Sequence, residues 1–337
     1  MLFRSSGMAG NYVQLLLARV GVAAGESVSG PATMSIIGDL YPAQKRGGAI
    51  GVLTVGAALG YSLGAVLAGA LNDRFGWHVA MMAVGAPGLL LALLMFLTVG
   101  EPKRGVHDRT QMHEPGMDSV WLGLKRIAAI RTAAPLLLGS IFLNFAFLAW
   151  LNWVPAFLMR VHHLKTTEMS AIFGLVAGLG GVASNLVAGL ISDRLARWGT
   201  RWRMYYCCIM IACAVPPLVA ALLLRDFVPS IICMTLFTLA AGGLTTVTGA
   251  ATLSISPPRL RAFMAAVFGL AVTVLGAGAG PWIIGALNDA LKGSYGEQAV
   301  RYSLLLAPAA FVVAGAMFFW ASRTIGEDAA VIASDAG

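Results

Sequence analysis

Charged residues are scarce in this sequence. Only 11% of its 337 residues are Asp, Glu, Lys or Arg, whereas 58% are hydrophobic. A soluble core of this length cannot bury so many apolar side chains, which excludes a soluble globular protein. The apolar residues instead form runs long enough to cross a bilayer, so we predict an all-α, polytopic membrane protein whose main partner is the lipid bilayer.

Motifs of catalysis, nucleotide binding and metal binding are also missing. The cysteines lie in apolar runs without CxxC or metal-ligand spacing, and we interpret them as small buried residues: Cys207, Cys208, Cys213 and Cys233. There is no P-loop and no pattern of nucleophile, base and oxyanion donor. We therefore expect no enzyme, cofactor or metal site. The net charge of +8 does not indicate nucleic-acid binding, because the basic residues lie in short turns between apolar runs.

Turns rich in charge, proline or glycine divide the apolar sequence into nine predicted transmembrane helices. They cover about 11–40, 46–72, 77–99, 133–161, 167–194, 202–225, 228–256, 260–289 and 299–323. The charged segment 100–132 separates a partial N-terminal bundle of three helices, 1–99, from a six-helix C-terminal bundle, 133–325, which a tail at 326–337 follows. Within that segment, 118–130 is predicted either as an amphipathic helix on the membrane surface or as a disordered linker.

The basic residues also predict the orientation of the chain. Lys and Arg are concentrated in alternate loops, starting with Lys45 and Arg46 and including 100–132. Because such loops stay on the cytoplasmic side, we place the 100–132 segment and the C-terminus in the cytoplasm. The expected location is the inner membrane of a cell.

Two strings recur in the same order and at a similar offset. GALND occurs at Gly69–Asp73 and again at Gly285–Asp289, 216 residues later, and GPATMSI at Gly30–Ile36 corresponds to GAATLSI at Gly249–Ile255. Such a repeat predicts two similar bundles in one orientation, which is typical of a large class of transporters. The offset places the start of the first bundle about 85 residues before Met1, so we expect the first three of twelve helices to be absent from this sequence.

The first predicted helix carries Arg19 and Glu26 away from its ends. Seven residues return to within about 20° of the starting direction, so both charges lie on one helical face, roughly 10 Å apart along the axis. Charges within a membrane span usually mark a substrate or ion path, and the alternative is an inert structural pair. Amides are also costly in lipid, so we expect Asn144, Asn152 and Asn185 to face a cavity. Trp150 and Trp153 are predicted either to line this cavity or to anchor the chain at the membrane interface.

The segment GLISDRLARWGTRWR, Gly189–Arg203, resembles the cytoplasmic Gly-x3-Asp-Arg loop of the major facilitator superfamily. This resemblance implies a two-bundle helical fold and a gate motif formed by Gly189, Asp193 and Arg194. Our hypothesis is that Asp193 sits at the N-terminus of the helix that begins near Arg46, where the helix dipole favours a carboxylate. The alternative is a solvated turn that serves only to orient the chain.

Four further strings resemble the spinster-like branch of this superfamily. They are ARVGVAAGES, which contains Arg19 and Glu26, GDLYPAQKRGGAIG, FGWH and NWVPAFLMR. That branch includes sphingolipid and lysolipid transporters and also bacterial members of unassigned substrate. The resemblance implies that the Arg and Glu of this helix act beside an acidic residue of the first helix.

These observations predict a monomeric secondary active transporter that moves an organic, anionic or lipid-like solute by alternating access. We expect Arg19 to fix the anionic group and Glu26 to titrate with the coupling ion, H+. The alternative is a non-transporting fragment, or a regulatory or binding membrane protein, that has the same fold.

Overall fold

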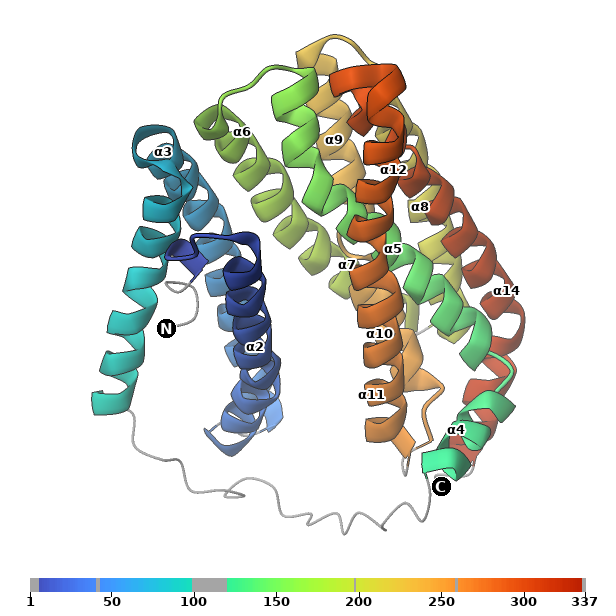
Figure 1. The fold of residues 1–337 in the computed structure, drawn as a ribbon. Helices are drawn as coiled ribbons and strands as arrows, with labels where there is room; N and C mark the ends of the chain where they lie inside the picture. Colours follow the sequence, from blue (N-terminus) through green and yellow to red (C-terminus); the bar gives the residue numbers. More distant parts are fainter. Residues whose placement is uncertain (1–5, 41–42, 99–119, 197, 258–259, 335–337) are drawn as a thin grey trace. The chain divides into compact units, whose positions relative to one another are not determined.

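The computed structural model describes residues 6–40, 43–98, 120–196, 198–257 and 260–334 (Figure 1). For Glu26, Arg46, Asp193 and some other helical residues it describes the backbone alone. Helices are the only regular elements in these ranges, which confirms the predicted all-α class. Six stretches are long and apolar enough to cross a membrane: Leu59–Thr98, Ala133–Val161, Thr166–Ser192, Thr200–Leu223, Phe227–Ser254 and Phe263–Ile332. Because the first and last exceed a single crossing, the number of nine transmembrane helices stays a prediction.

The chain forms two compact units. The first contains Met1–His113 and Leu164–Leu179, and the second contains Glu114–His163 and Gly180–Gly337. The segment Leu164–Leu179 begins the fifth predicted helix. The chain therefore passes from one unit to the other within one helical run.

The first unit contains four helical elements. They are α2 (Tyr12–Leu40), α3 (Ala43–Thr98), α6 (Thr166–Phe173) and the π-helix η1 (Gly174–Leu179). Both α6 and η1 pack along α3. A single non-helical residue, Gly76, divides α3 with φ of 78° and ψ of 167°. Glycine is favoured at this backbone conformation because it has no Cβ, and the break lies at the turn predicted between the second and third helices.

The second unit is a helical bundle. Its elements are α4 (Val120–Ala129), α5 (Ala133–Val161), α7 (Gly180–Ala196), α8 (Thr200–Leu223), α9 (Phe227–Ala241), α10 (Leu244–Ser254), α11 (Arg261–Ala271), the π-helix η3 (Val272–Gly278), α12 (Ala279–Tyr295), the 3-10 helix η4 (Gly296–Gln298), α13 (Ala299–Ser303) and α14 (Leu306–Ser334). Helix α14 packs along both α5 and α8, and α8 packs along α9 (Figure 1).

Aromatic side chains form the centre of this bundle. Trp150 of α5 meets Phe237 of α9 edge to face with ring centroids 4.9 Å apart, and Phe237 meets Phe311 of α14 at 5.5 Å. All three are almost fully buried, and such ring pairs add about 0.5–1.5 kcal/mol each beyond the burial of their area. Trp150 is therefore a core residue, and both roles predicted for it, in a cavity or at the membrane interface, were wrong.

The helix predicted within 118–130 is present as α4. Its Gly123 and Ile127 are buried, whereas Trp121 is exposed. Helix formation excludes the disordered alternative for residues 120–129. The location of α4 on the membrane surface stays a prediction.

Helix α14 continues to Ser334, beyond the predicted end near residue 323. Its Asp328 accepts hydrogen bonds from the backbone N of Thr132 at 2.8 Å and from the Thr132 hydroxyl at 2.6 Å. Thr132 is the N-cap residue of α5 and is fully buried. The carboxylate therefore satisfies two buried donors at the start of α5, and this contact favours the extra helical turns.

The predicted span 228–256 consists of two helices, because α9 ends at Ala241 and α10 begins at Leu244. Gly242 and Gly243 lie between them, where α9 and α10 both pack on α7. A Cβ at Gly243 would lie 2.2 Å from the Cβ of Ala188 and 2.6 Å from the carbonyl oxygen of Ser184. This close approach leaves no space for a side chain at Gly243.

Candidate functional site

A cavity of about 440 Å³ lies within the second unit, between α5, α10, α11 and η3. Small, hydroxyl and apolar residues line it: Ser140, Asn144, Thr245, Thr248, Gly249, Thr252, Leu253, Ala265, Phe268, Gly269 and Val272. These lining residues include no charged side chain. The cavity therefore suits the uncharged part of a solute.

Hydrogen bonds within the helices determine which polar atoms of the cavity wall remain available to a solute. The hydroxyls of Thr248 and Thr252 donate to the carbonyl oxygens of Thr245 and Thr248, at 3.1 and 3.0 Å. The Ser140 hydroxyl likewise donates to the carbonyl of Leu136 at 2.8 Å. Because these hydrogens are already used, the hydroxyl oxygens present acceptor lone pairs to the cavity. This wall can accept hydrogen bonds from hydroxyl or amine donors.

Two glycines leave room in the cavity wall. A Cβ at Gly249 of α10 or at Gly269 of α11 would meet no heavy atom within 4 Å. Both residues are exposed, and both line the cavity. A larger side chain at either position would occupy the cavity without displacing neighbouring atoms.

The threonines of α10 were not predicted as site residues. Thr245, Thr248 and Thr252 recur at intervals of three and four residues, which places them on one helical face. This spacing was visible in the sequence. It indicates a polar face on α10.

The three predicted amides lie in different environments. Asn144 lines the cavity and donates to the carbonyl of Ser140 at 3.0 Å. Asn185 of α7 is half-buried outside the lining set, and its side-chain oxygen accepts a hydrogen bond from the Thr246 hydroxyl at 2.8 Å. Asn152 is exposed and bonds to Leu148 of its own helix at 2.8 Å. Only Asn144 joins the threonine-lined cavity.

Trp153, the other aromatic residue predicted at the cavity or the interface, donates a hydrogen bond within the second unit. Its ring nitrogen lies 2.9 Å from the carbonyl oxygen of Pro281 on α12. Trp153 is half-buried and outside the lining set of the cavity. It connects α5 to α12.

The two predicted charges lie on α2 in the first unit. This helix has no interruption between Tyr12 and Leu40, so the seven-residue spacing of Arg19 and Glu26 keeps them on one face. The Arg19 side chain is exposed. The Glu26 side chain lies outside the described part of the structure.

The predicted gate motif is described only in part. Gly189 and Arg194 lie in α7, where Arg194 is exposed. The side chains of Asp193 and Arg46 are outside the described residues, so the proposed contact between Asp193 and the start of α3 stays a hypothesis.

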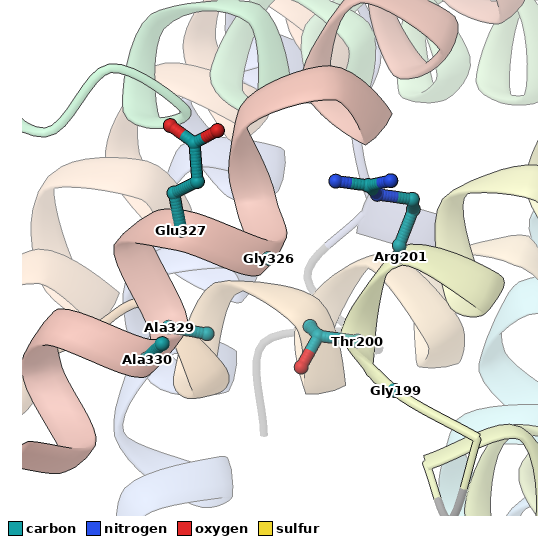
Figure 2. A pocket seen from close by; sticks show the side chains of 7 residues that line it. All are labelled: Gly199, Thr200, Arg201, Gly326, Glu327, Ala329 and Ala330. Atoms are coloured by element: carbon teal, nitrogen blue, oxygen red, sulfur yellow. The ribbon is translucent and has the colours of Figure 1, made fainter.

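A second, more open cavity of about 600 Å³ lies where α8 begins and α14 nears its end. Figure 2 shows Arg201 on α8 and Glu327 on α14 at opposite edges of this cavity, with Gly326 between them and Ala329, Ala330 and Thr200 below in this view. The cavity differs from the threonine-lined one because it carries charges of both signs. Within the described ranges, no three His, Cys, Asp or Glu side chains gather where they could hold a metal ion.

Comparison with known proteins gives consistent results. The sequence profile of the Major Facilitator Superfamily matches residues 1–281. An MFS-type efflux pump of Mycolicibacterium smegmatis is 29% identical over 307 residues, which are 91% of this chain and 70% of the pump. The sphingosine-1-phosphate transporter SPNS2 of Danio rerio is 27% identical over 92% of this chain and 66% of its own length. Protein spinster homolog 1 of Mus musculus is 28% identical, with 93% and 64% covered. The chain thus spans about two thirds of the length of these relatives.

Solved structures show the same fold. A bacterial homolog of the human lysosomal transporter Spinster, crystallised in an inward-facing and unoccupied conformation, matches with a TM-score of 0.83 and 24% identity. The match covers 97% of this chain and 81% of the homolog. The inward-facing and occupied conformation matches with a TM-score of 0.78 and 25% identity, over 97% and 80% of the two chains.

Proposed function

The chain belongs to the major facilitator superfamily, and we propose that it is a spinster-like member that moves an organic anion with a lipid-like body across the membrane by alternating access. It is a multi-pass membrane transport protein and not an enzyme. The substrate, the coupling ion and the access cycle are our proposals.

The proposed substrate class is based on the lining of the threonine-lined cavity. Its wall combines acceptor oxygens from Ser140, Thr248 and Thr252 with the apolar side chains of Leu253, Phe268 and Val272. A solute that fits this wall has hydroxyl or amine donors next to an apolar portion. Because the lining residues carry no cation, the acidic group of an anionic solute must be paired elsewhere.

Arg19 is our candidate for that pairing. A guanidinium binds phosphate or carboxylate through two parallel hydrogen bonds, and its charge persists at every physiological pH. Glu26, on the same face of α2, would then exchange a proton as the solute binds and leaves.

The relative from Danio rerio named as a sphingosine-1-phosphate transporter supports a phosphorylated, single-chain solute. Such a molecule has an anionic headgroup, hydroxyl and ammonium donors and an apolar chain, which are the three features that the proposed sites require. We further propose a monomer in the inner membrane, with the C-terminus in the cytoplasm and H+ as the coupling ion.

Uptake into proteoliposomes tests this proposal. The purified chain is reconstituted, and entry of radiolabelled sphingosine-1-phosphate and of a lysophospholipid is followed with and without a pH gradient. We expect saturable uptake of at least one probe that the pH gradient increases, and loss of this uptake in Arg19→Ala. Uptake equal to that of protein-free liposomes for both probes would overturn the substrate class, and wild-type rates in Arg19→Ala would overturn the role of the arginine.

A further inference from the structure

The first turn of α6 lacks a cap from its own N-cap residue. That residue is Lys165, and a lysine side chain can only donate hydrogen bonds. The first backbone N–H groups of a helix have no carbonyl partner within it. Glu168 of α6 accepts a hydrogen bond from the N–H of Lys165 at 3.0 Å. Here the N–H of Thr167 donates to the Asp73 carboxylate at 2.8 Å, so a residue of α3 caps α6.

Two further hydrogen bonds strengthen this junction. The hydroxyl of Thr167 also donates to the Asp73 carboxylate, and the side-chain amide of Asn72 donates to the Thr166 hydroxyl at 3.3 Å. A carboxylate at a helix N-terminus gains from the helix dipole and from hydrogen bonds that its charge strengthens. Two consecutive residues of α3 thus hold two consecutive residues of α6.

Close packing continues from this junction along the two helices. A Cβ at Gly69 would lie 2.4 Å from the Ser170 hydroxyl oxygen. One level further, the Ser62 hydroxyl donates to the carbonyl oxygen of Gly174 at 3.1 Å. Small residues allow transmembrane helices to approach this closely, so α3 and the run formed by α6 and η1 fit together with little space between them.

The helix that Asp73 caps leads out of the first unit. The run of α6 and η1 ends at Leu179, where the first unit ends, and the chain continues as α7 of the second unit. The element before this boundary is a π-helix, a rare geometry that is often found at functional positions. The predicted orientation places Asp73 and Thr167 at the outer membrane boundary. The contact between Asp73 and Thr167 therefore lies within the first unit, shortly before the chain continues into the second.

The internal repeat supplies a comparison within the same molecule. Asp289 ends the second GALND string as Asp73 ends the first. It is exposed on α12, and within the described part of the chain it has no hydrogen-bond partner. The GALND string alone therefore does not make the contact; the N-terminus of α6 completes it.

We infer that Asp73 is a latch residue, which holds the N-terminus of α6 against α3 by capping it and must release Thr167 before α6 can separate from α3. This inference rests on the proposed alternating-access cycle. Asp73 is neither one of the charged residues of α2 nor a lining residue of the threonine-lined cavity. Asp73 acts by positioning α6, and no contact with solute is required of it.

Distance measurements between two spin labels test this inference. The labels are attached to Phe75→Cys on α3 and Leu164→Cys just before α6, after the four native cysteines have been replaced. We expect mainly one short-distance population in the wild-type background. In Asp73→Ala, the ratio of long- to short-distance populations should rise roughly fivefold, which is the effect of losing a typical helix cap. Thr167→Val should raise it less, because the backbone donor remains.

Asp289→Ala is the matched control, and it should leave the distance distribution unchanged. An Asp73→Ala distribution equal to that of the wild type, or an equal rise in Asp289→Ala, would overturn the latch. The measurement uses no solute, so it separates the two proposals. If neither probe is transported and Asp73→Ala still shifts the populations, the substrate proposal fails and the latch remains.

Discussion

Helix α2 runs without interruption from Tyr12 to Leu40, whereas its counterpart in the internal repeat is divided into α9 and α10 at Gly242 and Gly243. The string AAG at Ala23–Gly25 recurs at Ala240–Gly242, which aligns the next residues, Glu26 and Gly243. At Gly243 the neighbouring Ala188 leaves no space for a Cβ, so close packing on α7 excludes a carboxylate from the second copy. The first copy retains the acid at this position.

The two copies of the repeat therefore carry different kinds of polar group. The second copy carries the threonines of α10, which line an uncharged cavity. The first copy carries Arg19 and Glu26, and charges within a membrane span usually mark a substrate or ion path. We therefore interpret the first copy as the source of charge and the second as the source of neutral hydrogen bonds.

The largest effect is expected when the charge is moved into the second copy. Gly243→Glu forces a side chain against Ala188 and Ser184, where a Cβ would lie 2.2 and 2.6 Å from existing atoms. Overpacking of this kind costs about 1–3 kcal/mol, and an unpaired buried charge adds to it. We expect a clear fall in the melting temperature of the detergent-solubilised protein. Gly249→Ala is the control, because its Cβ meets nothing within 4 Å; equal melting temperatures for both variants would contradict the packing explanation.

Filling the cavity should have the next largest effect. Gly249→Leu places a side chain in open space on the threonine-lined wall, so the fold should persist while the solute loses contact area. We expect the KM for the transported probe to rise about tenfold, which corresponds to about 1.4 kcal/mol of binding free energy. Gly293→Leu on α12 serves as the control, since a Cβ there also meets open space but lies outside the cavity lining. An unchanged KM in Gly249→Leu would exclude this cavity as the solute site.

The smallest effect concerns a histidine at the end of α5. Burial is the main cause that lowers the pKa of His162, and repulsion by Arg301 and His163 adds to it. The ring packs against Phe157 and Phe227 at 5.3 and 5.6 Å. As the pH falls below about 6.5, the unfolded chain binds a proton more readily than the folded one, so stability decreases.

Replacing this histidine by an apolar ring should remove that pH dependence. In His162→Phe, the fall in melting temperature between pH 7.5 and pH 5.5 should shrink by about 1 °C. The dependence of transport on pH should not change, because the second copy is assigned no coupling group. Loss of pH-dependent transport in this variant would show that the second unit also takes part in coupling.

Much of the fold could be predicted from hydrophobic runs, because the bilayer fixes the length and the backbone hydrogen bonding of its spans. The predicted spans 11–40 and 133–161 agree with α2 and α5 to within one residue. The break at Gly243 and the π-helices η1 and η3 could not be predicted in this way. They depend on which residues of another helix lie opposite, and hydropathy does not report that.

In the candidate site, too, residue type could be predicted to favour a location, but contacts with other helices could not be predicted. Asn144 was predicted to face a cavity because an amide is costly in lipid, and it lines one. Trp150 was assigned to a cavity or interface on residue type alone, and its packing against Phe237 places it in the core. The sequence placed Asp73 only in the GALND repeat. Its contact with Thr167 could not be predicted, because the two residues are 94 positions apart in sequence.

Proton-driven accumulation of solute by Glu26→Gln tests most directly whether the first copy of the repeat provides the coupling group. Proteoliposomes containing this variant are compared with the wild type in two assays: uphill uptake driven by a pH gradient, and exchange of labelled for unlabelled solute without a gradient. We expect Glu26→Gln to lose uphill uptake while it keeps exchange, because the neutral cavity and Arg19 still bind the solute. Uphill uptake by Glu26→Gln at the wild-type rate would contradict the assignment of coupling to the first copy.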